Sequence, residues 1–280
     1  MCMTPSVLLN IHGSPIQFSG LKTSALLSRL GAVGVKAGRG NAALFVQFVS
    51  SLRGFREKGF QETSSRLLLG DRFALDYSQR IMYFPLRASI RTGNSTRQGQ
   101  HFLLPRAVFF SLSLLYEMNA SIPASIAGLY LHASAVETRK GALVFCGEST
   151  FGKSTISEKL LTPFPKLEDD QTLIRMRATP CGTKPEVLIF RKSNRRLKDA
   201  VPLAGIFWLK KSPLFAIEPM DRATFASKIF SPMVNWTEPQ AVIRRLKLLR
   251  ALLDAVPCAE LSFAKESAPL IKLLRDSGFA

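Results

Sequence analysis

The sequence has few cysteines, four in 280 residues. Cys2, Cys146, Cys181 and Cys258 stand singly, without a CxxC pair and without a histidine–cysteine cluster at metal-ligand spacing. This scatter argues against a disulfide framework and against a zinc site. Isolated thiols fit a reducing compartment, so we expect a cytoplasmic location.

Long hydrophobic runs are also missing. The most apolar stretch, 107–118, follows Arg106 and is interrupted by Glu117, whereas a bilayer-spanning helix needs about 20 apolar residues. We therefore expect a buried helix there and no transmembrane segment. Residues 1–10 lack the cationic start and apolar core of a targeting segment.

Acidic residues are scarce relative to basic ones: Asp and Glu total 20 and Lys and Arg total 38, a net charge of +18. Such a surface attracts anions, including nucleotides, acidic peptides, nucleic acid and anionic membranes. The densest basic run, 191–198 (RKSNRRLK), is either a solvated loop or a contact surface for an anionic partner. Aromatic residues do not interleave with basic ones as they do in single-strand binders, so nucleic acid is not the expected partner.

The chain divides near residue 125. We expect a small N-terminal subdomain of unknown role, 1–125, and a nucleotide-binding domain, 126–280. Within the first, 41–52 has helical spacing and 104–119 is a helix candidate, while 66–86 resembles either short strands or a strand and a turn.

The second part alternates strand-like and helix-like segments, which predicts an α/β or mixed α+β fold. Within 240–256, the spacing of Val242, Leu246, Leu249 and Leu253 predicts one buried helix face. The strand-like segments are 129–137, 142–146, 167–176, 187–190, 204–209, 214–218 and 259–264, and the helix-like segments are 154–161, 221–229, 240–256 and 268–276.

One motif carries specific chemistry. The segment 147–154 (GESTFGKS) fits G-x-x-x-x-G-K-[ST] at every fixed position. Glycines let the backbone turn tightly around an anion, and the helix that follows adds its positive N-terminal end. Lys153 is expected to reach the β- and γ-phosphates of ATP, and the Ser154 hydroxyl to bind Mg²⁺.

The alternative is a chance Gly-Lys-Ser turn between core elements. An apolar strand before the motif and a helix-capable segment after it favour the phosphate site. Thr150 stands where a glycine would ease the turn, and Glu148 places an acid near the phosphates. The expected nucleotide-binding residues are Gly147, Glu148, Ser149, Thr150, Phe151, Gly152, Lys153, Ser154 and Thr155.

Two adjacent acids, Asp169 and Asp170, follow the motif at the start of an expected strand, which could return them beside the phosphate loop. A carboxylate there can hold Mg²⁺ or accept the proton of an attacking hydroxyl. Neighbouring residues point to opposite faces of a strand, so one acid should face the site more directly. The alternative is an exposed acidic turn.

His132 lies on the strand before the motif. A hairpin between the two strands would place its imidazole near the mouth of the site. The alternative is a core histidine with its hydrogen bonds satisfied, the more common role of a lone histidine on an apolar strand.

These residues together resemble the HPr kinase/phosphorylase family, and most closely its shorter relatives, which include lasso-peptide precursor kinases. The resemblance covers residues 128–265. It rests on the stretches HASAV at 132–136, Gly141, GESTFGKST at 147–155, LEDD at 167–170, PLAGIF at 202–207 and VPCAEL at 256–261.

The resemblance implies roles for single residues. His132 matches an active-site histidine of the family, and Lys153 and Ser154 match the phosphate-loop lysine and serine. Asp170 matches the acid that accepts the proton of the substrate serine, which leaves Asp169 as a metal-binding or orienting carboxylate. The implied fold is the phosphoenolpyruvate-carboxykinase-like P-loop nucleotide-binding domain with a mixed sheet, and self-association is also compatible with the family.

Two features of the family have no recognisable counterpart here. One is a further magnesium-binding glutamate; Glu186 lies in about the right region but lacks the flanking pattern. The other is an arginine in a later loop, for which Arg191, Arg195 and Arg196 are candidates only by position. These departures argue against phosphorylase activity and against HPr itself as substrate.

Two functions follow most directly from the sequence, and a weaker third is the phosphorylation of a small metabolite. The first is an ATP- and Mg²⁺-dependent kinase that phosphorylates a hydroxyl, most simply a serine of a peptide or small protein. Its catalytic residues would be Asp170, His132 and Lys153, and its metal-binding residues Ser154 and Asp169. The second is a nucleotide-dependent binding or regulatory module without phosphoryl transfer.

Overall fold

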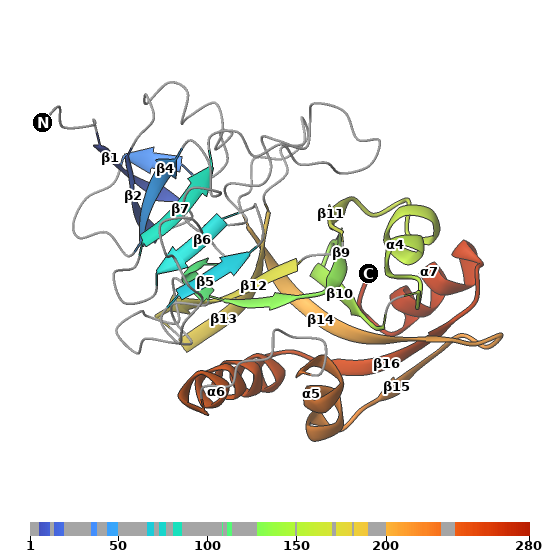
Figure 1. Cartoon of the computed structure of the whole chain (residues 1–280). Coiled ribbons are helices and arrows are strands. Elements are labelled where there is room, and N and C mark those ends of the chain that lie inside the picture. The colour runs from blue at the N-terminus through green and yellow to red at the C-terminus, as the bar shows by residue number, and fades with distance from the viewer. Residues whose placement is uncertain are drawn as a thin grey trace, which may run out of the picture. The chain divides into compact units, whose positions relative to one another are not determined.

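The chain forms two compact units (Figure 1). One comprises Met1–Ala127 with Phe190–Asp199, and the other Gly128–Ile189 with Ala200–Ala280. The computed structural model describes residues 6–11, 14–19, 35–37, 44–49, 66–69, 73–76, 81–85, 108, 111–113, 128–148, 150–169, 172–180, 182–189, 200–230 and 239–280.

The first unit contains a seven-stranded mixed sheet in the order β3-β1-β2-β4-β7-β6-β5. Ile16, Phe18, Val46 and Met82 are buried in it. The strands are β1 (Ser6–Ile11), β2 (Ser14–Ser19), β3 (Val35–Ala37), β4 (Leu44–Val49), β5 (Arg66–Leu69), β6 (Phe73–Asp76) and β7 (Ile81–Pro85).

The prediction for 41–52 was wrong over Leu44–Val49, which form a strand and not a helix. This segment (LFVQFV) is rich in aromatic and β-branched residues, and for so short an apolar run these decide more than spacing does. The strands predicted within 66–86 are confirmed as β5, β6 and β7. Within 104–119, the described residues 108 and 111–113 are helical.

The second unit contains a nine-stranded mixed sheet, whose main path runs β11-β9-β10-β14-β13-β12-β8. Strand β16 also pairs with β14, and β15 pairs with β16. The strands are β8 (Leu129–Leu131), β9 (Ala133–Thr138), β10 (Gly141–Cys146), β11 (Lys166–Glu168), β12 (Thr172–Thr179), β13 (Gly182–Leu188), β14 (Ala200–Lys211), β15 (Ala216–Pro219) and β16 (Cys258–Phe263).

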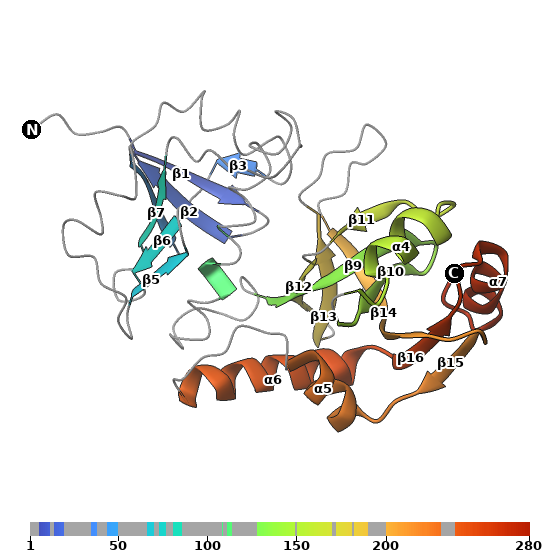
Figure 2. The same cartoon turned by 45° about the vertical axis from the view of Figure 1, so that its right-hand side comes forward.

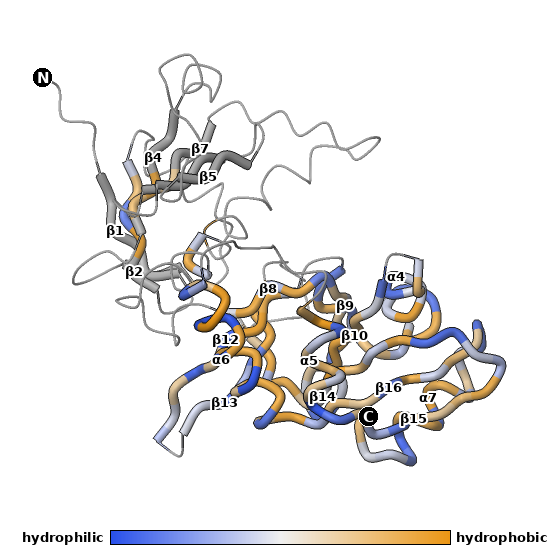
Figure 3. The backbone as a smooth tube through the Cα atoms, turned by 60° about the horizontal axis from the view of Figure 1, so that its bottom comes forward, coloured by the Kyte–Doolittle hydropathy of each residue, from blue (hydrophilic) through white to orange (hydrophobic). Residues whose placement is uncertain are grey.

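Strands β10, β14 and β16 are parallel and form the centre of this sheet. Alternate residues of these strands face a single hydrophobic core, which includes Phe145, Phe207 and Leu261. That core also contains side chains of η3 (Ile156–Leu160) and α7 (Ser267–Asp276), so these two helices cover one face. In Figure 3 the strands of this unit carry long hydrophobic stretches, as expected for a sheet with covered faces.

The opposite face of the central strands meets α5 (Arg222–Phe230). Lys228 of α5 lies over the ring of Trp208 at 5.4 Å and contacts Glu260 at 3.4 Å. Helix α6 (Pro239–Ala255) lies beside α5 and contacts β8 and β13 (Figure 2). None of the helices that the structure describes is long and apolar enough to cross a bilayer.

The sheet curls back on itself at His132. Strands β8 and β9 follow each other with only this residue between them, yet β8 pairs with β12 while β9 pairs with β10 and β11. The Thr172 hydroxyl at the start of β12 donates a hydrogen bond to the Ala133 carbonyl at 2.8 Å. This bond links the two ends of the curled sheet.

Three expectations for this unit need correction. The strand predicted over 129–137 is broken by a bend at His132, and the strand predicted over 167–176 is broken after Glu168. In α6, Leu246 is 43% exposed, while Leu249 and Leu253 are buried as expected. The buried face is rotated from the predicted one, because it also includes Ala241, Arg245, Leu248 and Leu252.

Gly141, the first residue of β10, has φ of +135°, and a Cβ there would lie 2.4 Å from the Pro202 carbonyl oxygen. We expect Gly141→Ala to combine left-handed strain with a backbone clash. Gly182→Ala is the matched control, because Gly182 has φ of +112° but no heavy atom lies within 4 Å of the position that a Cβ would take.

The free energy of unfolding should fall by about 1–2 kcal/mol in Gly182→Ala, from backbone strain alone. In Gly141→Ala it should fall by a further 1–3 kcal/mol, about the cost of overpacking. Urea unfolding of both variants gives the comparison. Equal losses of unfolding free energy in the two variants would contradict the close approach of β14 to Gly141.

Candidate functional site

The glycine-rich segment connects β10 to a helix, as the sequence predicts. Strand β10 ends at Cys146, and the helix begins with α4 (Lys153–Thr155) and continues as the π-helical η3. Cys146 pairs with Trp208 of the parallel strand β14. The segment 147–152 therefore lies at the carboxyl edge of the parallel strands, the usual place for a ligand in such a sheet.

The segment turns by means of two left-handed residues. Gly152, which caps the helix, has φ of +92°, and a Cβ there would lie 3.2 Å from Cζ of Phe263. Thr150 has φ of +78°, the one non-glycine residue with positive φ among the described residues. From the sequence, this position was expected to favour glycine, and the left-handed backbone of a β-branched residue is strained.

The Lys153 side chain lies inside the loop. Its Nζ donates hydrogen bonds to the carbonyl oxygens of Gly147 and Glu148, both at 2.9 Å. The residue is only 7% exposed, and burying an ammonium group is costly unless it is hydrogen-bonded. The Lys153 charge is therefore held within the turn, where a phosphate oxygen could replace a carbonyl as its partner.

Ser134 of β9 fixes the start of the helix. Its buried hydroxyl donates to the Lys153 carbonyl at 2.8 Å, and the Ser157 hydroxyl donates to the same carbonyl at 3.1 Å. Ser134 was not among the site residues expected from the sequence. The available signal was a hydroxyl among the apolar residues at the start of this strand, two residues after His132.

Ser154 and Asp169 meet as the sequence predicts. The Ser154 hydroxyl donates to Asp169 Oδ1 at 3.0 Å, although Asp169 lies in a bend after β11 and not in a strand. Lys166 Nζ contacts Asp169 Oδ2 at 3.1 Å and also contacts Glu158. Lys166 and Glu158 were not expected from the sequence, because single lysines and glutamates are common on protein surfaces and these two belong to no motif.

The pKa of Asp169 lies below its ordinary value of 3.8. Partial burial raises this pKa, but the hydrogen bond and charge of Lys166, together with the hydrogen bond from Ser154, outweigh the burial. Asp169 is therefore an ionised carboxylate at neutral pH, as a metal-binding role requires.

His132 is exposed at the bend between β8 and β9. The next residue, Ala133, pairs with Cys146, the last residue of β10. The strand register therefore places His132 at the same sheet edge as the start of the loop, and its role there stays a prediction.

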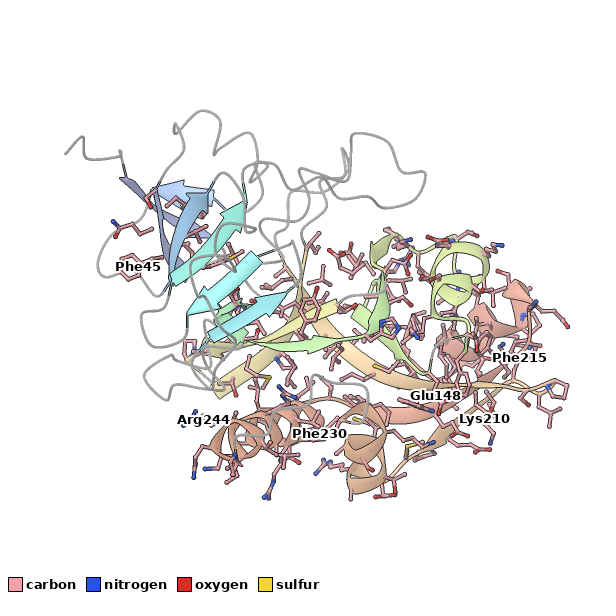
Figure 4. All side chains as sticks on the ribbon, viewed as in Figure 1. Phe45, Glu148, Lys210, Phe215, Phe230 and Arg244 are labelled. Atoms are coloured by element: carbon pink, nitrogen blue, oxygen red, sulfur yellow. The ribbon has the colours of Figure 1, made fainter. Side chains whose placement is uncertain are left out.

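The other predicted residues are placed as follows. Glu148 is exposed (labelled in Figure 4), so its carboxylate does not fill the turn. Phe151 packs against the core below the loop, and its N–H donates to the Glu148 carbonyl at 3.2 Å. Thr155 is half-buried. Ser149 and Asp170 lie outside the described residues.

The Glu186 carboxylate forms ion pairs with two arginines. Arg175 Nε donates to Glu186 Oε1 at 3.0 Å, Arg175 Nη2 contacts the same oxygen, and Arg177 Nε lies 3.5 Å from Oε2. Arg175 and Glu186 are buried. These contacts give Glu186 a structural role in the sheet. The three arginine candidates, Arg191, Arg195 and Arg196, lie outside the described residues.

Cysteine chemistry is not indicated at this edge. Cys146 and Cys258 are free thiols. Burial raises the pKa of Cys146 to about 12 against the opposing charge of Lys153, and burial raises the pKa of Cys258 to about 11. Neither thiol forms the reactive thiolate at neutral pH. Cys2 and Cys181 lie outside the described residues.

The residues present fit Mg²⁺ only as part of a larger set of ligands. The Ser154 hydroxyl and the Asp169 carboxylate are oxygen donors, which Mg²⁺ prefers, and they are already in contact. Among the described residues there is no group of three or more His, Cys, Asp or Glu that could hold a metal. Phosphate oxygens and water would have to complete the coordination, as is usual for nucleotide-bound Mg²⁺.

Removing the Glu186 carboxylate should destabilise the second unit. Glu186→Ala leaves the buried Arg175 guanidinium without these contacts, and breaking a buried pair costs about 3–5 kcal/mol. Arg177→Ala is the control: its side chain is 59% exposed, and exposed ion pairs contribute about 0–1 kcal/mol. Chemical unfolding measures both losses, and a small loss for Glu186→Ala would contradict the structural role.

The lowered pKa of Asp169 predicts a pH dependence. The interaction stabilises the folded state above the unfolded pKa of 3.8, and this stabilisation is lost as the pH falls through the lower folded-state pKa. The difference in unfolding free energy between the wild type and Asp169→Asn should therefore shrink as the pH falls below 3.8. A constant or growing difference in acid titrations would contradict the assignment.

Comparison with known proteins identifies a family. The model of the family described as SynChlorMet cassette protein ScmC matches residues 110–255, just over half of the chain. No curated protein matches.

Among solved structures, the chain is similar to the Hpr(Ser) kinase/phosphatase from Coxiella burnetii. The identity is 15% and the TM-score 0.29, over 53% of this chain and 90% of that one. At this TM-score the likeness carries no argument about fold or activity. The mixed sheet and the position of the loop rest on the structure of the chain itself.

Proposed function

The chain belongs to the family of the SynChlorMet cassette protein ScmC, and we propose that it is an ATP-dependent kinase that phosphorylates a hydroxyl group, most simply a serine of a peptide or small protein. The family description states no activity. The observation that carries the proposal is the Lys153 ammonium group, buried within a glycine-bounded turn that a helix follows and that Ser154 and Asp169 flank.

The geometry supports phosphate binding in three ways. The Lys153 ammonium can exchange a backbone carbonyl for a phosphate oxygen without leaving the turn. Left-handed residues at Thr150 and Gly152 shape the backbone as phosphate loops require. The loop also lies at the carboxyl edge of the parallel strands β10 and β14.

The proposal assigns a role to each of the residues at this edge. Lys153 holds the β- and γ-phosphate oxygens and balances charge on the transferred phosphoryl group. Ser154 and Asp169 would hold Mg²⁺, which supplies charge neutralisation when it is bound. Asp170, next in the chain, accepts the proton of the attacking hydroxyl, and His132 lines the same edge.

The alternative is a module that binds nucleotide without transferring phosphate. One observation favours it: Glu186, the candidate for a further magnesium-binding glutamate, is taken up by Arg175 and Arg177. Incubation with γ-labelled ATP and a peptide library separates the two functions. Label in a peptide supports the kinase, whereas nucleotide binding with no transfer and no turnover supports the module.

Asp170→Asn tests the kinase proposal on the peptide that the library identifies. We expect transfer to fall by about 10²–10⁴-fold, the usual contribution of a general base, while the affinity for ATP is retained. Asp276→Asn, which removes an exposed carboxylate at the end of α7, is the control and should transfer normally. Full transfer by Asp170→Asn would contradict the role of this residue.

A further inference from the structure

Four polar side chains form a chain of contacts beside the phosphate loop. Ser154 donates to Asp169 Oδ1 at 3.0 Å, and Lys166 Nζ contacts Asp169 Oδ2 at 3.1 Å. The same ammonium group contacts Glu158. Both oxygens of the Asp169 carboxylate are thus held, one by the loop serine and one by Lys166.

The backbone closes this chain into a ring. Ser154 and Glu158 lie one turn apart on the helix formed by α4 and η3. Lys166 is the first residue of the short strand β11 and pairs there with Val136 of β9, and Asp169 lies in the bend directly after the strand. The ring therefore joins the helix that follows the loop to the strand that delivers Asp169.

Stability alone does not account for these contacts. The side chains of Lys166, Asp169 and Glu158 are 22%, 21% and 46% exposed, and water screens partly exposed ion pairs, so their contribution to folding stability is modest. Orientation is a better account, because the terminal torsion of an aspartate is broad and a free carboxylate can turn away from Ser154. Lys166 restricts that rotation by holding Oδ2.

The charges in the ring leave room for a cation. Lys166 alone would neutralise Asp169 and weaken its attraction for a metal. Glu158 supplies a second negative charge, so the three charged groups keep a net charge of −1. The ring can therefore orient the carboxylate without cancelling its charge.

We propose that Lys166, itself held by Glu158, is a positioning residue that keeps Asp169 Oδ1 on Ser154 and so prepares this pair for nucleotide-bound Mg²⁺. The inference rests on the proposed nucleotide binding but not on phosphoryl transfer. In this proposal Lys166 acts only through its contact with Asp169.

The test is the effect of Mg²⁺ on ATP affinity, measured by calorimetry with MgCl₂ and, separately, with EDTA. Loss of a residue that holds a metal ligand typically costs about 10–100-fold in metal affinity. Lys166→Met should therefore lower the Mg²⁺-dependent gain in ATP affinity by about 10–100-fold, with the affinity in EDTA unchanged. Lys166→Arg, whose guanidinium can hold two carboxylates, should restore most of the gain.

Two further variants complete the design. Lys159→Met removes an exposed lysine from the same helix, next to Glu158 but outside the ring, and should behave as the wild type. Glu158→Gln should also lower the Mg²⁺-dependent gain in ATP affinity, because it releases Lys166 and removes one negative charge. Combined with Lys166→Met, it should cost less than the sum of the two single losses, because both variants act on the position of Asp169.

If Lys166→Met kept the full Mg²⁺-dependent gain in ATP affinity of the wild type, the inference would be overturned. An equal loss of ATP affinity with and without Mg²⁺ would also overturn it, because a general structural defect gives that result. A wild type that binds Mg²⁺-ATP but phosphorylates nothing would defeat the kinase proposal and leave this inference standing. A wild type that binds no ATP would overturn both.

Discussion

The candidate site depends on one buried charge. A buried ammonium group such as that of Lys153 needs hydrogen-bond acceptors, and the carbonyls of Gly147 and Glu148 supply them. Those two bonds require the loop to fold around the lysine. Ser134 then ties the Lys153 carbonyl to β9, so the loop, the helix and the neighbouring strand are fixed by contacts to a single residue.

The positions of Ser154 and Asp169 follow from this arrangement. Ser154 is the next residue on the helix, and its hydroxyl meets the carboxylate that β11 delivers. An anion that enters the turn must compete with the two carbonyl oxygens for the Lys153 ammonium group. A fully charged phosphate can do so, because a hydrogen bond between two charged groups is stronger than one to a neutral carbonyl. The excess of basic residues in the chain favours the approach of such an anion.

Much of this site could be predicted from the sequence because its information is local. The spacing of Gly147, Gly152, Lys153 and Ser154 identifies the loop, and the apolar run before it identifies β10. The strain at Thr150 was also predictable, since left-handed turns favour glycine. The mixed α+β character of the second unit followed from the order of its segments.

What could not be predicted depends on distant partners. The break at His132 exists because β8 and β9 join opposite ends of a curled sheet, and a continuous apolar pattern gives no sign of that. The bond from Ser134 to the Lys153 carbonyl and the pair of Arg175 with Glu186 form only when separate segments meet. The exposed face of α6 likewise depends on which elements the helix contacts, so Leu246 was placed on the wrong side.

The most direct test of phosphate binding at this loop is an experimental structure with Mg²⁺ and a non-hydrolysable ATP analogue. We expect the phosphates within the turn 147–154, with Lys153 Nζ moved from at least one backbone carbonyl to a phosphate oxygen and with Mg²⁺ on Ser154. A nucleotide bound elsewhere, or a Lys153 that keeps both carbonyl contacts with the analogue present, would contradict this expectation.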